Sequence, residues 1–491
     1  YGIDVSHGRT DIKKADKDDK AKIPKIITSP SSSSPSYHFV VSSDCSTFQK
    51  WQVFTQIHSA LSVQQTGKYT WIISGCSSDG KMVKDKTRSN TSVLTEDMIR
   101  DEVTRHFHTS SSTENDDEEQ IIQRPNLHFT PDYTDMSVYG GPYADGSKKR
   151  VYVNPQNGKT TPSNYGNDYK FNNKPNSLQH WAEYLHEAGL DQKNEAIVHI
   201  DPDFLFLKKF AFPDSVDAPS PGKPVAAMYG LGTQWKYFNT TAICGVKSRC
   251  NTISHGDAHK YFSAGPPYMI HISDVLRFST VWSSFVPATY DQYPLLYAEM
   301  YAYSMAAVHL DLKHTLVKEK FMTGCMVGWP KVNDSKAREA LVASSNAYKA
   351  LVVKKELARA DNSATDIGVV DKSGGMGPSS CFPSTFEPPS FLHYCNRYIF
   401  SSIPSSLDST IDESQDQGED VSYYFFAKRR VDRDIFHCQK REEEFTPWKS
   451  TKVESKIANG KGNNGVEWNA LSTCAVVRAI NYAIERGGCH Y

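Results

Sequence analysis

Several features that would indicate a nucleic-acid-binding or membrane-spanning protein are missing from this sequence. Its 491 residues carry 55 Lys and Arg against 56 Asp and Glu, so bulk charge gives no reason to expect a nucleic-acid partner. No run approaches the roughly eighteen apolar residues of a membrane span, and the richest stretch, 293–310, contains Glu299. The chain starts at Tyr1 rather than Met, so we expect membrane attachment only through an N-terminal anchor that precedes this residue.

The sequence also lacks paired Cys-x-x-Cys spacings, which argues against a structural zinc site. Its 10 cysteines are an even number, which suits disulfides, and Cys244 and Cys250 could close a small loop together. Asn-x-Ser/Thr sequons occur at Asn90, Asn239 and Asn333. Because disulfides persist in oxidising compartments, we expect a protein of the ER or Golgi lumen, or a secreted one.

Composition divides the chain into four parts. Residues 1–36 are rich in Lys, Asp, Ser and Pro and predict a disordered stem or linker. Residues 37–330 hold the strand and helix patterns of a nucleotide-binding core, interrupted by a polar insertion at 77–124. Residues 331–380 predict a helical segment followed by a linker, and 381–491 predict a C-terminal part that packs on the core.

The core begins with a strand at 37–43, a helix at 48–63 and a second strand at 69–75. A strand, a helix and a parallel strand form the opening unit of a nucleotide-binding α/β sheet. Residues 42–45, at the end of the first strand, would then lie near a bound nucleotide, and Ser43 is the candidate among them. Residues 125–172 lack sustained periodicity and predict loops over the sheet.

Two carboxylates stand at the centre of this pattern. Residues 197–200 predict a short buried strand, and Asp201 and Asp203 follow it directly. Acids at the carboxyl end of a strand lie where open α/β sheets bind ligands. An Asp-x-Asp pair there could hold a hard divalent cation together with a substrate diphosphate. An exposed Asp-Pro-Asp turn is the alternative from these residues alone.

Other charged residues could join this site. Lys174 lies at the start of a helix predicted from residue 173 and could add positive charge for a phosphate. Residues 423–430 predict a strand whose basic end, with Lys428 and Arg429, could neutralise phosphates or form a solvated basic cluster. Glu299 lies on a mostly apolar helix, where a carboxylate needs a partner or a polar cavity. It is the catalytic candidate expected nearest the sugar, and a structural pair with a buried Arg or Lys is the alternative. Asp274 is expected first as a helix cap and second as a catalytic residue.

An ordered set of motifs in this sequence resembles a known family. The set comprises Asn173-Lys-Pro with Trp181, Asp201-Pro-Asp, Pro224-Val-Ala-Ala, Gly265-Pro-Pro, Glu299-Met-Tyr-Ala-Tyr, Leu392-His-Tyr and Phe425-Phe-Ala-Lys-Arg. It resembles the hydroxyproline O-arabinosyltransferases and peptidyl serine α-galactosyltransferases of plants and green algae. The likeness runs from about residue 37 to the C-terminus, outside the insertions.

The resemblance implies a GT-A-like, Rossmann-like sheet flanked by helices, with the C-terminal part completing the active site. It implies a retaining glycosyltransferase in which Asp201, Asp203 and His393 bind Mn²⁺ or Mg²⁺ and the donor is a UDP-sugar. The acceptor would be a polypeptide rich in Ser or hydroxyproline. Asp201 favours the galactosyl branch, whereas Pro202 and the residues after it match neither branch, so galactose and arabinofuranose both stay open. The alternative is a catalytically inactive, lectin-like or structural glycoprotein with the same fold.

Overall fold

The computed structural model describes most of the chain from Pro35 onward. The described residues are 35–79, 83–84, 91–107, 122, 124–146, 149–324, 327–360, 377–395, 397–402, 422–436, 445–450 and 466–486. Almost all of the predicted stem, much of the polar insertion and the sequon at Asn90 lie outside these residues.

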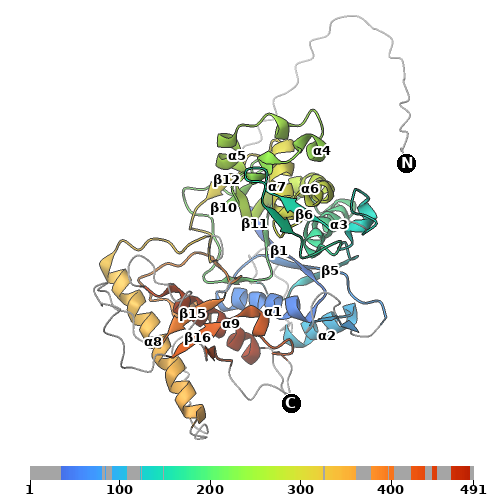
Figure 1. Cartoon of the computed structure of the whole chain (residues 1–491). Helices are drawn as coiled ribbons and strands as arrows, with labels where there is room; N and C mark the ends of the chain where they lie inside the picture. The colour runs from blue at the N-terminus through green and yellow to red at the C-terminus, as the bar shows by residue number, and fades with distance from the viewer. Residues whose placement is uncertain are drawn as a thin grey trace, which may run out of the picture. The chain divides into compact units, whose positions relative to one another are not determined.

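A mixed α/β architecture is built on a 7-stranded sheet within the described residues (Figure 1). Its strands, in spatial order, are β12 (Thr315–Val317), β10 (Val225–Met228), β11 (Ala264–His271), β8 (Glu195–Ile200), β1 (Ser36–Asp44), β2 (Lys68–Ser74) and β5 (Asn126–Thr130). β11 runs antiparallel to both of its neighbours, and the other pairings in the sheet are parallel. The predicted α/β class with a flanked, parallel-dominated sheet is therefore confirmed.

Helices cover both faces of this sheet (Figure 1). On one side, α3 packs on β1 and β2 and against α6, which in turn packs against α7. On the other side, α1 packs against α9. The helices are α1 (Thr47–Ser62), α2 (Glu96–His106), α3 (Asn173–Glu187), α4 (Thr240–Cys244), α5 (His255–Phe262), α6 (Ile272–Gln292), α7 (Ala298–His309), α8 (Ser335–Ala360) and α9 (Trp468–Arg486). With both faces covered, every residue of β8 is buried, including the polar side chains of Glu195 and His199.

The order of the strands places a switch point between β1 and β8. The chain leaves β1 towards β2 and β5, then returns to pair β8 with the other side of β1. Ligands of open α/β sheets bind at such a point, outside the carboxyl ends of the strands. Val41 of β1 pairs with Ile200 of β8, so the residues that follow these two positions share one edge of the sheet.

Smaller sheets attach the C-terminal part to the core. β13 (Met322–Gly324), β14 (Phe391–His393) and β9 (Phe204–Phe206) form one, and β15 (Tyr398–Ser401), β16 (Tyr423–Phe426) and β17 (Trp448–Ser450) form another. The remaining strand pairs are β3 (Val83–Lys84) with β4 (Ser92–Val93) and β6 (Val151–Val153) with β7 (Thr160–Pro162). β9 follows Asp201 and Asp203 directly. Its pairing with β14 therefore places part of the C-terminal region beside the carboxyl ends of β1 and β8.

Three sequence predictions about these elements are wrong. The stretch 125–172, expected to be loop, contains β5, an edge strand whose few half-buried residues give too short a pattern to recognise. The predicted strand 423–430 ends at Phe426, and a single 3-10 turn, η7 (Lys428–Arg430), follows it. Asp274 does not cap α6, because His271 is the N-cap and accepts a hydrogen bond from the Ser273 amide.

Disulfides fix two regions of the described structure. Cys45–Cys76 joins the segments that follow β1 and β2, and Cys381–Cys474 joins the C-terminal part to α9. The predicted pair Cys244–Cys250 is confirmed. Among the described residues, no helix combines the length and the hydropathy that crossing a bilayer would require.

Candidate active site

Asp201 and Asp203 lie at the carboxyl end of β8, beside the switch point. β8 ends at Ile200, and β9 begins at Phe204, so the intervening Asp-Pro-Asp forms the turn between two buried strands. Asp203 is 8% exposed, which excludes the alternative of a solvent-exposed turn for this carboxylate. The main-chain oxygen of Asp201 accepts a hydrogen bond from Gln56 Nε2 on α1 at 2.7 Å, which holds the turn against the core.

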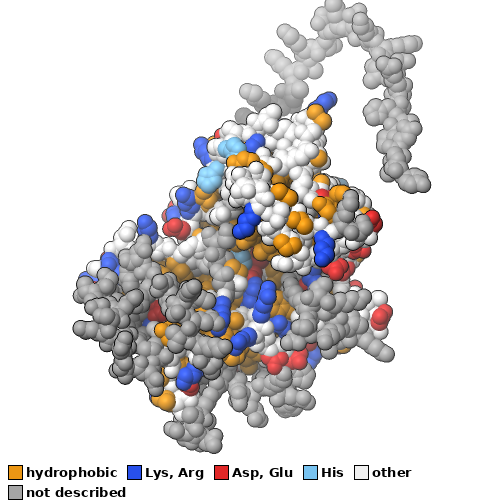
Figure 2. All heavy atoms as spheres, in the orientation of Figure 1, with side chains coloured by type: hydrophobic (Ala, Val, Ile, Leu, Met, Phe, Trp, Pro, Cys, Tyr) orange, Lys and Arg blue, Asp and Glu red, His pale blue; other side chains and the backbone are white. Residues whose placement is uncertain are grey.

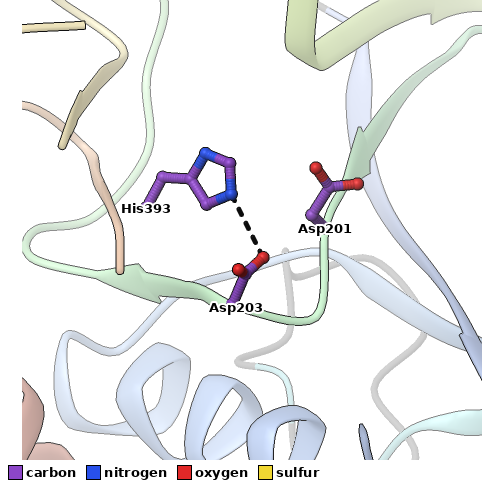
Figure 3. A group of neighbouring side chains, drawn as sticks. All are labelled: Asp201, Asp203 and His393. Carbon is purple, nitrogen blue, oxygen red and sulfur yellow. Dashed lines mark ion pairs between the residues drawn. The ribbon is translucent and has the colours of Figure 1, made fainter. Parts of the chain in front are cut away.

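His393 comes to this turn through the small sheet. His393 of β14 pairs with Phe204 of β9, and the Tyr394 amide donates a hydrogen bond to the Asp203 carbonyl at 3.0 Å. The imidazole stacks on the Phe204 ring, with centroids 4.5 Å apart, and its Nε2 lies 3.2 Å from Asp203 Oδ1. Figure 3 shows the three side chains grouped at the end of β8.

The three residues have the composition of a divalent-cation site. Asp201, Asp203 and His393 each offer one ligand atom, and these atoms lie within 4.8 Å of one another. Carboxylate oxygens are ligands that Mg²⁺ and Mn²⁺ prefer, and Mn²⁺ also accepts imidazole nitrogen. The donor set therefore fits the cation that the resemblance implies.

Asp203 has a second basic neighbour, Lys428 from η7. The Lys428 ammonium donates a hydrogen bond to Asp203 Oδ2, opposite the oxygen that faces His393. Burial alone would raise the pKa of Asp203, but Lys428 and His393 outweigh it and hold that pKa well below its ordinary value. Asp203 is consequently a carboxylate at neutral pH, which is the form a cation ligand needs.

Asp201 is held by a different basic residue. Lys174, the second residue of α3, places its Nζ 2.6 Å from Asp201 Oδ1 and 3.3 Å from Glu299 Oε1 of α7. Burial alone would lower the pKa of Lys174, but the two carboxylates raise it above its ordinary value. Lys174 is therefore a permanent cation between the turn and α7.

Glu299 is the least satisfied acid of this group. It is 3% exposed, and its Oε2 accepts no hydrogen bond from any described residue. Burial raises the pKa of Glu299 to about 7, Lys174 opposes that rise, and Asp201 adds to it. The sequence left a buried basic partner and a polar cavity as alternatives. The structure supplies the partner in Lys174 and leaves one oxygen facing no protein donor.

His393 is oriented by residues that the sequence did not indicate as functional. The Tyr229 hydroxyl lies 3.3 Å from His393 Nδ1, which leaves Nε2 to face the carboxylates. Tyr229 fits there because Gly265 has no side chain, since a Cβ at this position would come within 2.3 Å of the Tyr229 ring. A Cβ on Gly324 would meet the His393 carbonyl oxygen at 2.4 Å. These two glycines are thus close-approach positions behind the site.

At the end of β1, Asp44 rather than Ser43 has a side-chain oxygen that accepts no hydrogen bond from the described residues. The Ser43 side chain is buried, accepting a hydrogen bond from Trp71 Nε1 at 2.7 Å. Asp44 Oδ2 accepts no hydrogen bond from the described residues and lies 3.7 Å from Lys170 Nζ. The predicted range 42–45 included Asp44. Its position as an acid at the end of a strand beside the switch point could have identified it from the sequence.

None of the described contacts joins Arg429 or Asp274 to the three candidate ligands. Arg429, next to Lys428, lines a cavity with other residues of its own segment and the start of α1. Asp274 follows β11, where His271 pairs with Ala196 at the amino end of β8. From Ala196 to Asp201, the extended chain of β8 covers about 16 Å at 3.3 Å per residue. The Asp274 carboxylate accepts hydrogen bonds from the Gly222 amide and the Arg277 guanidinium, so the structure does not bring it to the turn.

Comparison with known proteins finds distant structural likeness. No protein-family model matches the chain, and no curated protein does. The chain is similar to the solved structure of galactosyltransferase LgtC in complex with donor and acceptor sugar analogs, at 10% identity and a TM-score of 0.32, covering 73% of this chain and 87% of that one. It is also similar to mouse xyloside xylosyltransferase 1, apo form, at 11% identity and a TM-score of 0.27, covering 58% of this chain and 86% of that one. Similarity at this level does not assign a function, so the function is inferred from the site.

Proposed function

We propose that this protein is a metal-dependent, retaining glycosyltransferase that moves a sugar from a UDP-sugar to Ser or hydroxyproline of secreted polypeptides. The observation that carries the proposal is the meeting of Asp201, Asp203 and His393 within 4.8 Å at the switch-point edge of the sheet. Basic and acidic residues surround this group in the arrangement that diphosphate departure and sugar binding need. The motif resemblance supports the same assignment.

Asp201, Asp203 and His393 would hold Mn²⁺ or Mg²⁺. A bound cation supplies Lewis-acid stabilisation to the departing diphosphate, worth several kcal/mol at the transition state. Lys428 lies against Asp203 and carries a cationic ammonium into the same region, so it would neutralise a phosphate oxygen. Lys174 holds Asp201 in place and balances its charge.

Asp44 and Glu299 would contact the two ends of the donor. Asp44 lies at the end of β1 with an oxygen that accepts no hydrogen bond from the described residues, although Lys170 lies near it, and this oxygen would accept a hydrogen bond from the nucleoside. Glu299 Oε2 would accept a hydrogen bond from a sugar hydroxyl or stabilise positive charge that develops at the anomeric carbon. Donor binding would then satisfy two buried oxygens that the described residues leave without donors.

Features outside the site support a lumenal or secreted location. The structure contains disulfides at several described cysteines, and the two described sequons, at Asn239 and Asn333, are exposed. Disulfides and exposed sequons are typical of proteins of the secretory route, where cell-wall and extracellular polypeptides are modified. The resemblance names the acceptor class and limits the donor sugar to galactose or arabinofuranose.

The test is a donor and acceptor screen on the purified protein. UDP-galactose and UDP-arabinofuranose are each combined with a Ser-rich and a hydroxyproline-rich peptide, with Mn²⁺ or with EDTA. We expect UDP release with one donor, loss of release in EDTA, and a product with the anomeric configuration of the donor. The absence of UDP release from either donor, together with the absence of a Mn²⁺-dependent thermal shift with UDP, would instead support the inactive structural glycoprotein.

A further inference from the structure

A cavity next to the candidate active site has no role in the proposal above. It measures about 590 Å³, a size typical of ligand pockets. Its lining joins the segment after β16 to the start of α1, and consists of Thr47, Ser92, Arg429, Arg430, Val431, Asp432, Arg433, Asp434 and Trp448. None of the three candidate cation ligands is among these residues.

Two guanidinium groups in this lining have no acidic partner among the residues that the structure describes. Arg429 and Arg430 are exposed, and neither forms an ion pair with a residue that the structure describes. Arg430 lies over the Phe425 ring at 4.8 Å, which limits its motion. Guanidinium groups pair preferentially with carboxylates and phosphates, often through two parallel hydrogen bonds. These two guanidinium groups could therefore bind an anionic group of a ligand.

Arg433 fixes the segment that carries these two groups. Its guanidinium donates hydrogen bonds to the Val431 and Arg429 carbonyl oxygens, both at 3.2 Å. It also lies 4.3 Å over the Phe48 ring in the first turn of α1. The segment therefore has a defined shape before any ligand arrives, which lowers the entropic cost of binding.

The remaining lining residues favour a polypeptide over a polyphosphate or a sulfated glycan. Asp432 and Asp434 are exposed carboxylates in the same lining and would repel a ligand with dense negative charge. A peptide carries isolated carboxylates together with amide N–H groups. The Asp434 carboxylate can accept hydrogen bonds from such N–H groups. Trp448 adds an aromatic surface for an apolar or proline side chain.

The cavity also lies at a distance that suits an extended acceptor. Lys428, in contact with Asp203, immediately precedes Arg429 in η7. On α1, Thr47 lines the cavity, and Gln56, which binds the Asp201 carbonyl, lies about 13 Å further along at 1.5 Å per residue. An extended peptide covers that distance in about four residues.

We propose that the cavity around Arg429 and Arg430 binds an acidic segment of the polypeptide acceptor, about four residues from the hydroxyl that receives the sugar. This inference rests on the proposed function, because it assumes a polypeptide acceptor. It predicts that the protein selects acceptors by carboxylates near the modified residue.

The experiment measures peptide binding, which needs no turnover. A fluorescein-labelled peptide holds one serine and a pair of glutamates about four residues away, and its partner has glutamines instead. Fluorescence anisotropy with UDP and Mn²⁺ gives the affinities of the full chain, of Arg430→Gln, and of the Arg429→Gln/Arg430→Gln variant. The matched control is Arg486→Gln, whose guanidinium lies over Tyr482 and outside the cavity.

We expect the full chain and Arg486→Gln to bind the glutamate peptide about tenfold more tightly than the glutamine peptide. Arg430→Gln should reduce this preference, and the double variant should remove it. A preference that survives in the double variant overturns the proposal. An equally large loss of UDP affinity in that variant overturns it too, since it assigns the cavity to the donor. Stronger competition by a sulfated oligosaccharide than by the free glutamate peptide also overturns it.

The result separates the two proposals. Turnover of a UDP-sugar with peptides of either charge would refute only the acidic-segment inference. Charge-selective peptide binding without any UDP release would refute only the enzymatic function.

Discussion

Asp201 and Asp203 are separated by one residue, yet different regions of the molecule hold their carboxylates. Asp201 is bound by Lys174 of α3, which also reaches Glu299 of α7, and both helices flank the central sheet. Asp203 is bound by His393 and Lys428, which come from the C-terminal part through small sheets. The central region thus supplies a buried ion network, and the C-terminal region supplies a cation ligand and a phosphate contact.

The site is therefore formed where two regions of the chain meet, and the Asp-x-Asp turn alone does not build it. Losing a contact in the central region should mainly cost stability, because Glu299 is buried and Lys174, whose side chain is 12% exposed, pairs with two carboxylates. Losing one in the C-terminal region should mainly cost cation and donor binding, because Lys428 is 21% exposed.

The largest effect should follow from Asp203→Asn, which removes charge where the two regions meet. We expect sugar transfer to fall by about a thousandfold, equivalent to about 4 kcal/mol of transition-state stabilisation. Calorimetric titration with Mn²⁺ and UDP should show a parallel loss of cation affinity. Asp214→Asn, at an exposed loop position, is the control. Full transfer activity in Asp203→Asn would refute the cation assignment.

Next in size is the loss of stability in Lys174→Met. Asp201 and Glu299 would then lose their shared cation, and breaking a buried ion network costs about 3 kcal/mol. Urea unfolding measures the loss, and adding Glu299→Gln should recover part of it. Lys428→Met should cost less, about 1 kcal/mol, because Lys428 is more exposed than Lys174 and His393 still faces Asp203. Equal losses in the two Lys variants would contradict the distinction between the regions.

A third variant, Gly324→Ala, tests the C-terminal region without touching a charge. Gly324 has φ 92° and its Cβ would collide with the His393 carbonyl, so β14 must shift. We expect a loss of about 2 kcal/mol in unfolding free energy and weaker Mn²⁺ binding. Gly232→Ala is the matched control, since Gly232 has φ 68° but nothing near its Cβ. The Gly232→Ala control should lose stability without losing Mn²⁺ affinity.

The smallest effect concerns the pH dependence that Glu299 adds to the central region. Its pKa is about 7 in the folded protein, above the ordinary 4.5, so the folded state binds this proton more tightly than the unfolded state. Stability should therefore fall as pH rises towards 7 and level off above it. Between about pH 5.5 and 7, wild type should lose about 1.5 kcal/mol relative to Glu299→Gln. Urea midpoints in EDTA across this range check the result, and parallel curves would contradict the raised pKa.

Local patterns predicted much of the central region. β1, α1, β2, α3 and β8 lie within one or two residues of their predicted ranges, because each has a clear apolar period or a buried run. Asp201 and Asp203 could be chosen as candidates because a strand end fixes where its next residues lie. The edge strand β5 was missed, since a half-buried strand of this length carries little periodic signal.

The sequence by itself determined that a buried strand ends in two acids, and that Lys174 begins a helix. Periodicity is local, so it cannot show which distant side chains meet at that strand end. Only the tertiary structure decided that Glu299 shares Lys174 with Asp201. It also decided that Ser43 binds Trp71 whereas one Asp44 oxygen accepts no hydrogen bond from the described residues. His393 was available only through the family resemblance, because the pairing of β14 with β9 that brings it to Asp203 joins segments far apart in the chain.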